Sequence, residues 1–367
     1  MRPLAALALI ALVAGCATTT PGIEVAAPLT STTTTSTTAP SASSVAPPVS
    51  SSPPPAPPTP AQAPIPPAGN PAGKAAIPAD AKAEDVSKPT RVVGDGTPGS
   101  CTSQAVVSAI AAGGVITFSC GAAPMTITMA ATAQVRTATV LDGGGKVTLS
   151  GGGKRRIITL DAPNQDKPRL VLQNLTFADG NSSDGDGGGA VYVRGGGVKV
   201  VNSRFLRNKC AATGPDLGGA ALRVNQAKLL PIYVVSSTFD SGSCANGGAL
   251  SGLHVSFTVL NSVMTHNTAI GRGANPARPG TPGGGSGGAI YTDGDKYTVR
   301  IAGSIIQDNH ANEGGGAAFY VSNDRTGSMT IESSTLTRNK SDGFETIPGI
   351  FYLGTTEKPA MTGSTVS

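Results

Sequence analysis

A short pattern of apolar and polar positions recurs seven times between Leu170 and Val366. Two apolar residues with one residue between them precede a small doublet, and a further apolar residue lies three positions after the doublet begins. The doublets begin at Asn174, Asn202, Ser236, Asn261, Gly303, Ser333 and Gly363, at intervals of 25 to 42 residues. A repeat near thirty residues with variable insertions is typical of a solenoid, in which each repeat forms one coil.

The residues before each doublet predict a strand, because apolar positions alternate with a position that tolerates water. The two apolar columns are Leu170, Val198, Ile232, Phe257, Val299, Met329 and Leu172, Val200, Val234, Val259, Ile301, Ile331. The column between them includes Lys199 and Thr258, which we expect to be exposed. A third interior column follows the doublets: Phe177, Phe205, Phe239, Met264, Ile306, Leu336 and Val366.

Each repeat also contains a strand that begins with two glycines, starting at Gly188, Gly218, Gly247, Gly287 and Gly315. Asn208, Asn267, Asn309 and Asn339 fall six residues after their doublets, where we expect a left-handed corner and stacked asparagines. Short strands joined by sharp corners predict an all-β fold, a right-handed parallel β-helix. Residues 102–112 predict a short helix that caps its N-terminal end, because a solenoid needs its exposed strand edges covered.

These motifs resemble two groups of proteins. Gly-Gly-Ala strands paired with Phe-x-x-Asn, as in Phe205 to Asn208, resemble the repeats of chlamydial polymorphic outer-membrane proteins. The stretch from about Val92 onward, including Thr139 to Gly144 and Val147 to Gly151, resembles the entry coils of the pectate-lyase-like superfamily. Both resemblances imply the β-helix fold. They leave function open, because that superfamily includes lyases, hydrolases, tailspikes and adhesins.

The first 89 residues predict export and a tether. Arg2 and the apolar run from Leu4 to Val13 form a signal peptide over residues 1–15, too short to span a bilayer. The sequence around Cys16 resembles a bacterial lipobox, which implies lipidation of Cys16 and a membrane anchor. Residues 16–89 are rich in Thr, Ser, Pro and Ala, and such a composition predicts a disordered tether. The folded domain is then expected over residues 90–367.

This arrangement predicts a lipid-anchored protein of the cell envelope, on the outer membrane or cell surface of a Gram-negative bacterium. Export also favours disulfides. Cys101 and Cys120 bracket the predicted cap and are expected to be bridged. Cys210 and Cys244 lie at equivalent positions in adjacent coils, where either a bridge or a reduced, inward-facing pair fits the spacing. The formal net charge is +5 with no Lys/Arg run that would indicate nucleic-acid binding.

Candidate sites lie in loops rich in oxygen ligands and glycine. Asp179, Asn181, Asp184 and Asp186 could hold Ca²⁺, or could serve only as turn formers. No other cofactor is indicated. The long insertion between Ile270 and Ser286 reflects either neutrality or a partner, and we hypothesise a binding loop, because solenoids often gather insertions on the face that binds. Candidate binding residues in and after it are Arg272, Asn275, Arg278, Asp293 and Asp295.

The glycine-led strands also contain an aromatic column with Tyr192, Tyr291 and Phe319. An outward orientation would make it a strip for stacking sugars, and an inward one would make it core. Arg223 in the neighbouring column favours the inward orientation.

The function expected from the sequence is non-catalytic binding of polysaccharide or another cell-surface ligand, as in an adhesin. The alternatives are a polysaccharide lyase or glycoside hydrolase on the same scaffold, and a structural component of the envelope. The sequence alone shows no convergent catalytic cluster.

Overall fold

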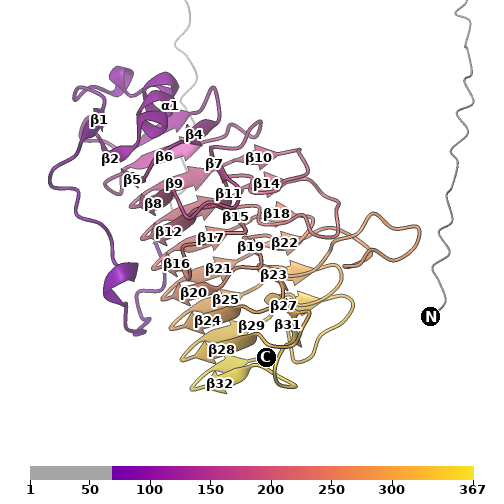
Figure 1. The fold of residues 1–367 in the computed structure, drawn as a ribbon. Helices are drawn as coiled ribbons and strands as arrows, with labels where there is room; N and C mark the ends of the chain where they lie inside the picture. The colour runs from indigo at the N-terminus through magenta and orange to yellow at the C-terminus, as the bar shows by residue number, and fades with distance from the viewer. Residues whose placement is uncertain (1–67) are drawn as a thin grey trace, which may run out of the picture. The chain divides into compact units, whose positions relative to one another are not determined.

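The computed structural model describes residues 68–367, and these residues form a parallel β-helix (Figure 1). All strand pairings between coils are parallel, and successive coils add one strand to each of four sheets, which we call A, B, C and D. Along the chain a full coil visits the sheets in the order A, B, D, C. The predicted fold class is therefore confirmed. Cys16 and the rest of the predicted signal peptide and tether up to residue 67 lie outside the described residues.

Sheet A contains β1 (Arg91–Val93), β2 (Gly114–Phe118), β5 (Thr139–Asp142), β8 (Arg169–Gln173), β12 (Gly197–Val201), β16 (Ile232–Val235), β20 (Phe257–Leu260), β24 (Thr298–Ala302), β28 (Ser328–Glu332) and β32 (Ala360–Thr362). Sheet B contains β3 (Met125–Thr128), β6 (Val147–Ser150), β9 (Thr176–Ala178), β13 (Arg204–Leu206), β17 (Thr238–Asp240), β21 (Val263–Thr265), β25 (Ile305–Gln307), β29 (Thr335–Thr337) and β33 (Thr365–Val366).

Sheet C contains β4 (Ala133–Val135), β7 (Ile158–Ala162), β11 (Val191–Gly195), β15 (Leu222–Asn225), β19 (Leu250–Leu253), β23 (Ile290–Gly294), β27 (Ala318–Ser322) and β31 (Ile350–Leu353). Sheet D contains the two-residue strands β10 (Asn181–Ser182), β14 (Lys209–Cys210), β18 (Ser243–Cys244), β22 (Thr268–Ala269), β26 (His310–Ala311) and β30 (Lys340–Ser341).

The three predicted apolar columns form the core. In sheet A, Val200 pairs with Leu172 on one side and Val234 on the other, and all three are fully buried. In sheet B the phenylalanine column stacks face to face, with ring centroids of Phe177 and Phe205 at 4.9 Å and those of Phe205 and Phe239 at 4.8 Å. Such offset stacking adds to the stability gained from burial alone.

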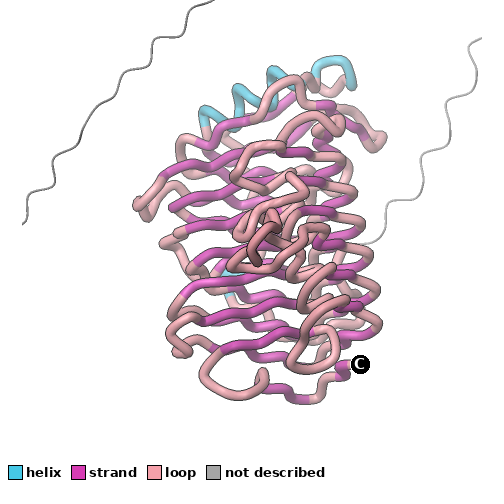
Figure 2. Tube along the Cα trace, turned by 90° about the vertical axis from the view of Figure 1, so that its right-hand side faces the viewer, coloured by secondary structure: helices cyan, strands magenta, loops and turns pink. Residues whose placement is uncertain are grey.

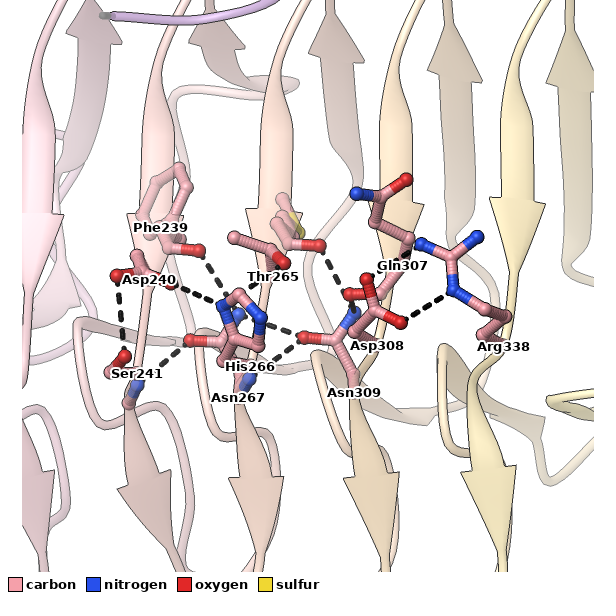
Figure 3. Close-up of polar contacts among 12 residues, drawn as sticks. Phe239, Asp240, Ser241, Thr265, His266, Asn267, Gln307, Asp308, Asn309 and Arg338 are labelled. Atoms are coloured by element: carbon pink, nitrogen blue, oxygen red, sulfur yellow. Dashed lines mark hydrogen bonds and ion pairs between the residues drawn. The ribbon is translucent and has the colours of Figure 1, made fainter. Parts of the chain in front are cut away.

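Two ladders of polar side chains run inside the corners. The second residue of most doublets is a serine, whose hydroxyl oxygen accepts a hydrogen bond from a backbone amide of the preceding coil. For example, the amide of Ser237 donates to Ser262 Oγ at 3.2 Å. The asparagines do the same, and Asn309 Oδ1 accepts from the amide of Asn267 at 2.9 Å (Figure 3). Both ladders satisfy buried backbone donors at the turns, which would otherwise be costly.

The left-handed residues at the second corner directly precede the asparagines, and this corrects the expectation that the asparagines themselves take that conformation. Arg207, His266, Asp308 and Arg338 have φ near +55° and directly precede Asn208, Asn267, Asn309 and Asn339, while Ser241, with a similar φ, precedes Gly242. The asparagines after them point inward and are buried. The chain therefore uses ordinary side chains at the strained position, while the interior ladder of hydrogen bonds holds the corner in shape.

The N-terminal cap is α1 (Ser103–Ala112), which buries Val106 and Ile110 over the first coils. The hydroxyl of Thr102 accepts from the amide of Ala105 and so caps the helix start. Two short 3₁₀ helices, η1 (Ala79–Ala81) and η2 (Pro98–Ser100), precede it. Within residues 68–367 no helix is long and apolar enough to cross a membrane.

The structure contains both of the disulfides considered above. Cys101 is joined to Cys120 beside the cap, with Cα atoms 5.7 Å apart. Cys210 is joined to Cys244 in sheet D, with Cα atoms 4.7 Å apart. The second bridge links two adjacent coils and is buried beneath Leu217 and Ala245.

Residues 68–88, which we call the strap, are packed along the outer face of sheet A (Figure 1). The packed part of the chain therefore includes residues 68–88, which the sequence had assigned to the tether. The composition of the strap cannot form a core of its own. Instead, Ala81 of the strap is fully buried against the outer face of sheet A, beside Tyr233 and Val235. Asn261 binds both backbone groups of Ala75, with contacts of 2.9 Å each way.

The strap also buries Lys199, which the alternating pattern had marked as exposed. The Lys199 side chain is 2% exposed, and its Nζ donates to the carbonyl oxygens of Asp80 and Lys82 and to Glu84 Oε1, at 3.1, 2.6 and 2.6 Å. The prediction was wrong because a segment remote in sequence covers a position that faces away from the core. Thr258, the other position expected to be exposed, is half-buried.

Candidate binding cleft

The outer face of sheet C carries a row of polar and aromatic side chains that is covered by loops. Strand register places Tyr192, Arg223, Ser251, Tyr291, Phe319 and Phe351 in this one row. The row alternates with Val191 and Leu222, which face the core, so it faces outward. Arg223 lies in the aromatic column itself, and the strand that begins at Gly218 is shifted by one residue relative to its neighbours.

The inward orientation favoured by the sequence is therefore wrong, and an exposed strip for stacking sugars is absent as well. Tyr291 is fully buried and Phe319 is 2% exposed, in a satellite cluster with Leu253, Phe344 and Phe351. Long connections on this side of the molecule lie in front of the stack near its middle (Figure 2). The row is thus the floor of a covered surface.

The insertion 270–286 is held against the coils at defined points. Glu313, which is 7% exposed, accepts from the amide of Gly273 at 2.7 Å and from both terminal nitrogens of Arg278 at 2.7 and 2.8 Å. Arg272 and Ala274 form bridges to Gly283 and Gly284, so the loop folds back on itself. The loop is therefore packed against the coils and against itself.

The connection 211–217 is a second loop beside the insertion 270–286. The side-chain amide of Asn246, which is fully buried, donates to the carbonyl oxygens of Gly214, Pro215 and Leu217. The amide of Gly214 also donates to the carbonyl of Gly283 at 3.3 Å, which joins the two loops.

Four polar side chains converge where these loops meet sheet C. Asn275 Nδ2 donates to Asp216 Oδ1 at 2.6 Å and to Asp293 Oδ2 at 2.9 Å, and lies 2.8 Å from the Tyr291 hydroxyl. The Tyr291 hydroxyl in turn lies 3.2 Å from Asp216 Oδ1 and 3.4 Å from Asp293 Oδ2. Each carboxylate comes from a different part of the chain, and Asn275 bridges them.

A cleft of about 320 Å³ opens beside this cluster. Its polar lining consists of Asp216, His254, Asn275, Asp293 and Asn323, and its apolar lining of Leu253, Pro276 and Val321. Asn323 Nδ2 donates to Asp293 Oδ1 at 2.9 Å, so both oxygens of that carboxylate are fixed. A small cavity with a few oriented polar groups beside apolar walls is the usual form of a small-molecule site.

Burial raises the pKa of Asp293, and the nearby charge of Asp216 adds to this effect. The pKa of the Tyr291 hydroxyl is held well above its ordinary value by the same causes, burial first and then the two carboxylates. The Arg278 guanidinium instead lowers the pKa of Glu313, so this anchor is ionised at neutral pH. The cleft therefore places a carboxyl group whose pKa is raised beside a second carboxyl group.

The structure brings together two of the five predicted binding residues, Asn275 and Asp293. Arg278 anchors the loop through Glu313, and Arg272 is exposed on the loop. Asp295 lies at the rim, where its carboxylate is 3.9 Å from His254 Nδ1. The sequence did not reveal Asp216, His254 or Asn323, because loop geometry rather than repeat register places Asp216 opposite Asp293.

The four residues of the predicted calcium loop are not gathered around a common point. Arg207 binds Asp179 through two contacts of 2.9 Å, and Arg156 binds Asp184 at 2.7 Å. Asn181 donates to the carbonyl of Gly153. Asp186 donates its backbone amide to Asp184. Among residues 68–367 no group of three or more His, Cys, Asp or Glu side chains is placed to hold a metal ion.

The histidines do not assemble a serine triad. His266 Nδ1 lies 2.9 Å from Asp240 Oδ1, but Ser241 Oγ contacts Asp240 rather than the imidazole (Figure 3). A nucleophilic serine must touch its base, so this trio lacks the required order. His310 instead pairs with Asp342 at 2.9 Å.

Comparisons of the chain with protein-family models, with curated proteins and with solved structures each return no match.

Proposed function

We propose that this protein is a lipid-anchored binding protein of the bacterial envelope whose sheet C cleft holds a sugar unit of a polysaccharide. The observation that carries the proposal is the convergence of Asp216, Asn275 and Asp293 at a cleft of about 320 Å³. Carboxylates and amides match the hydroxyl groups of a sugar, and the walls of Leu253 and Val321 match its C–H faces. The β-helix and its repeats, which resemble those of outer-membrane and pectate-lyase-like proteins, fit such a role.

The test is titration of the full chain in detergent with a panel of neutral and acidic oligosaccharides, followed by calorimetry. We expect Asn323→Ala to weaken binding by about 3- to 10-fold, since one hydrogen bond contributes about 0.5–1.5 kcal/mol. Asn181→Ala is the matched control, because that amide makes its single contact at Gly153, outside the cleft. Equal affinities for both variants and the parent would refute the cleft as the binding site.

The anchor has its own test. Cys16→Ser should shift the protein from the membrane fraction to the soluble fraction, because the acyl chains on Cys16 are the proposed anchor. Retention of this variant in the membrane fraction would contradict lipid anchoring.

A second candidate is glycoside hydrolysis in the same cleft. Asp216 and Asp293 both accept from one amide nitrogen, so these two oxygens lie at most about 5.5 Å apart, which is compatible with the separation of about 5–5.5 Å that retaining glycosidases use. The raised pKa of Asp293 suits an acid that protonates the leaving oxygen, while Asp216 attacks the anomeric carbon. Release of reducing ends from the oligosaccharide panel, lost in Asp293→Asn, would support it. Binding without any release would leave only the first proposal.

A further inference from the structure

A second surface, remote from the cleft, gathers basic side chains at the edge of sheet A where its strands begin. We call this set, Arg136, Lys167, Arg169 and Lys228, the basic edge. Thr139 of β5 pairs with Leu170 of β8, and Arg136 and Lys167 each lie three residues before them, so they belong to adjacent coils at the same edge.

The row continues into the next coils. Arg169 pairs with Gly197 of β12, and the backbone amide of Lys228 donates to the carbonyl of Gly196 at 2.9 Å. Adjacent coils are about 4.8 Å apart, so the basic edge spans roughly 14 Å along the solenoid.

Among residues 68–367 these cations have no carboxylate within ion-pair distance. Elsewhere Arg156, Arg194, Arg207, Arg278, Arg300 and Arg338 each form an ion pair with a carboxylate. Within residues 68–367 no side chain of the basic edge forms an ion pair, and three of the four are exposed, Arg169 being half-buried. Asp166 is the acidic residue beside them, so the group carries a net charge of about +3.

A cavity of about 490 Å³ lies among these cations. Arg136, Lys167 and Arg169 line it together with Asp166, Pro168 and Leu229. Guanidinium groups bind carboxylate, sulfate or phosphate through two parallel hydrogen bonds, and apolar walls accept the carbon skeleton of a sugar. Cations repeated from coil to coil match a linear polymer that carries an anionic group on successive units. A single small anion would contact only part of this row.

We propose that the basic edge is a second binding site, for a chain of an acidic polysaccharide. It stands independently of the sheet C cleft, because the two sites share no residue. The site binds through charge at several coils, so its affinity falls as salt screens the interaction. The cleft, by contrast, reads uncharged hydroxyl groups and depends little on salt.

The experiment measures binding of the full chain in detergent to dextran sulfate and, as the uncharged counterpart, to dextran, at about 50 and about 200 mM salt. The test variant is Arg136→Gln with Lys167→Gln and Lys228→Gln. The control variant is Lys296→Gln with Arg325→Gln and Lys358→Gln, which removes the same charge from exposed side chains elsewhere. We expect the test variant to lose at least about tenfold in affinity for dextran sulfate at low salt, with a shallower salt dependence, and the control to retain the parental affinity.

Three results would overturn the proposal. The parent could bind dextran sulfate no better than dextran, or both triple variants could lose affinity equally, which would show an effect of overall charge. The third arm uses vesicles of phosphatidylglycerol in phosphatidylcholine: a loss confined to vesicle binding would assign the edge to lipid head groups. Asn323→Ala changes only the cleft, so its effect on oligosaccharide binding tests the proposed function separately. Its affinity for dextran sulfate should equal that of the parent if the basic edge is an independent site.

Discussion

Replacement of Lys199 by methionine tests how much one buried cation contributes to holding the strap against sheet A. Methionine keeps the apolar stem and much of the volume, so packing beneath the strap is retained while the ammonium group is lost. The carbonyl oxygens of Asp80 and Lys82 and the carboxylate of Glu84 then lose a common donor. Hydrogen bonds to a charged group contribute about 1.5–3 kcal/mol each when buried.

The full sum does not apply, because Asp80, Lys82 and the Glu84 carboxylate border solvent and water can replace part of the lost contact. We therefore expect the free energy of opening the strap to fall by about 2–4 kcal/mol. This corresponds to about 30- to 1,000-fold faster amide exchange in the strap.

Hydrogen exchange read by mass spectrometry measures this directly. The amide of Ala81 donates to the carbonyl of Pro78, and that of Glu84 donates to Gln173 Oε1, so both should be protected in the parent and exposed in the variant. Lys340→Met is the matched control, since Lys340 is 72% exposed and pairs only with Asp342. Unchanged exchange in the strap of the Lys199 variant would refute the reasoning, and so would an equal effect of the control.

Three further predictions concern the core, the loop and the cleft. Phe205→Ala removes the middle ring of the stack and should cost about 3–5 kcal/mol in chemical denaturation, and a cost below about 1 kcal/mol would contradict the packing seen here. Glu313→Gln should raise protease cleavage within 270–286 at neutral pH. The pKa of Glu313 is lowered in the native state, so its charge stabilises the loop at pH values above the ordinary pKa of 4.5. Parent and variant should converge as the pH falls through the lower native pKa. Asp293 behaves oppositely, because its raised pKa favours the protonated native state. The melting temperature of the parent relative to that of Asp293→Asn should be highest below pH 3.8. It should fall as the pH rises through the higher native pKa of Asp293. A pH-independent difference would contradict this assignment.

The sequence predicted the coil but not what covers it. The columns through Val200 and Phe205 follow from alternation and period, because each interior position must pack on the same position one coil away. Lys199 was misassigned because alternation separates the core side of a strand from its other side and says nothing about a remote segment placed over the latter. The same limit applies to Tyr291, which faces outward and is nevertheless fully buried.

The cleft shows a related limit. Asp293 could be singled out because it ends a glycine-led strand, and Asn275 because it lies in the longest insertion. Their common partner Asp216 belongs to a connection with no repeat register, and its position depends on the contacts of Asn246 with the loop backbone. Local pattern therefore identified Asn275 and Asp293, whereas the position of Asp216 required the folded loops.

The path of the strap determines how a pulling force would enter the solenoid. The chain enters the described part of the molecule beside Asn261 and Gly303, where Asn70 donates its backbone amide to the carbonyl oxygen of Asn261 and its side-chain amide to that of Gly303. Only then does the chain run back to the cap. Tension applied at residue 68 would therefore act on the flank of the middle coils. The strap contacts at Asn261, Tyr233, Lys199 and Gln173 lie in sequence along the line of pull and would share the load in shear. The first coil, which a chain leaving directly from the cap would peel away one hydrogen bond at a time, is thereby shielded from the force.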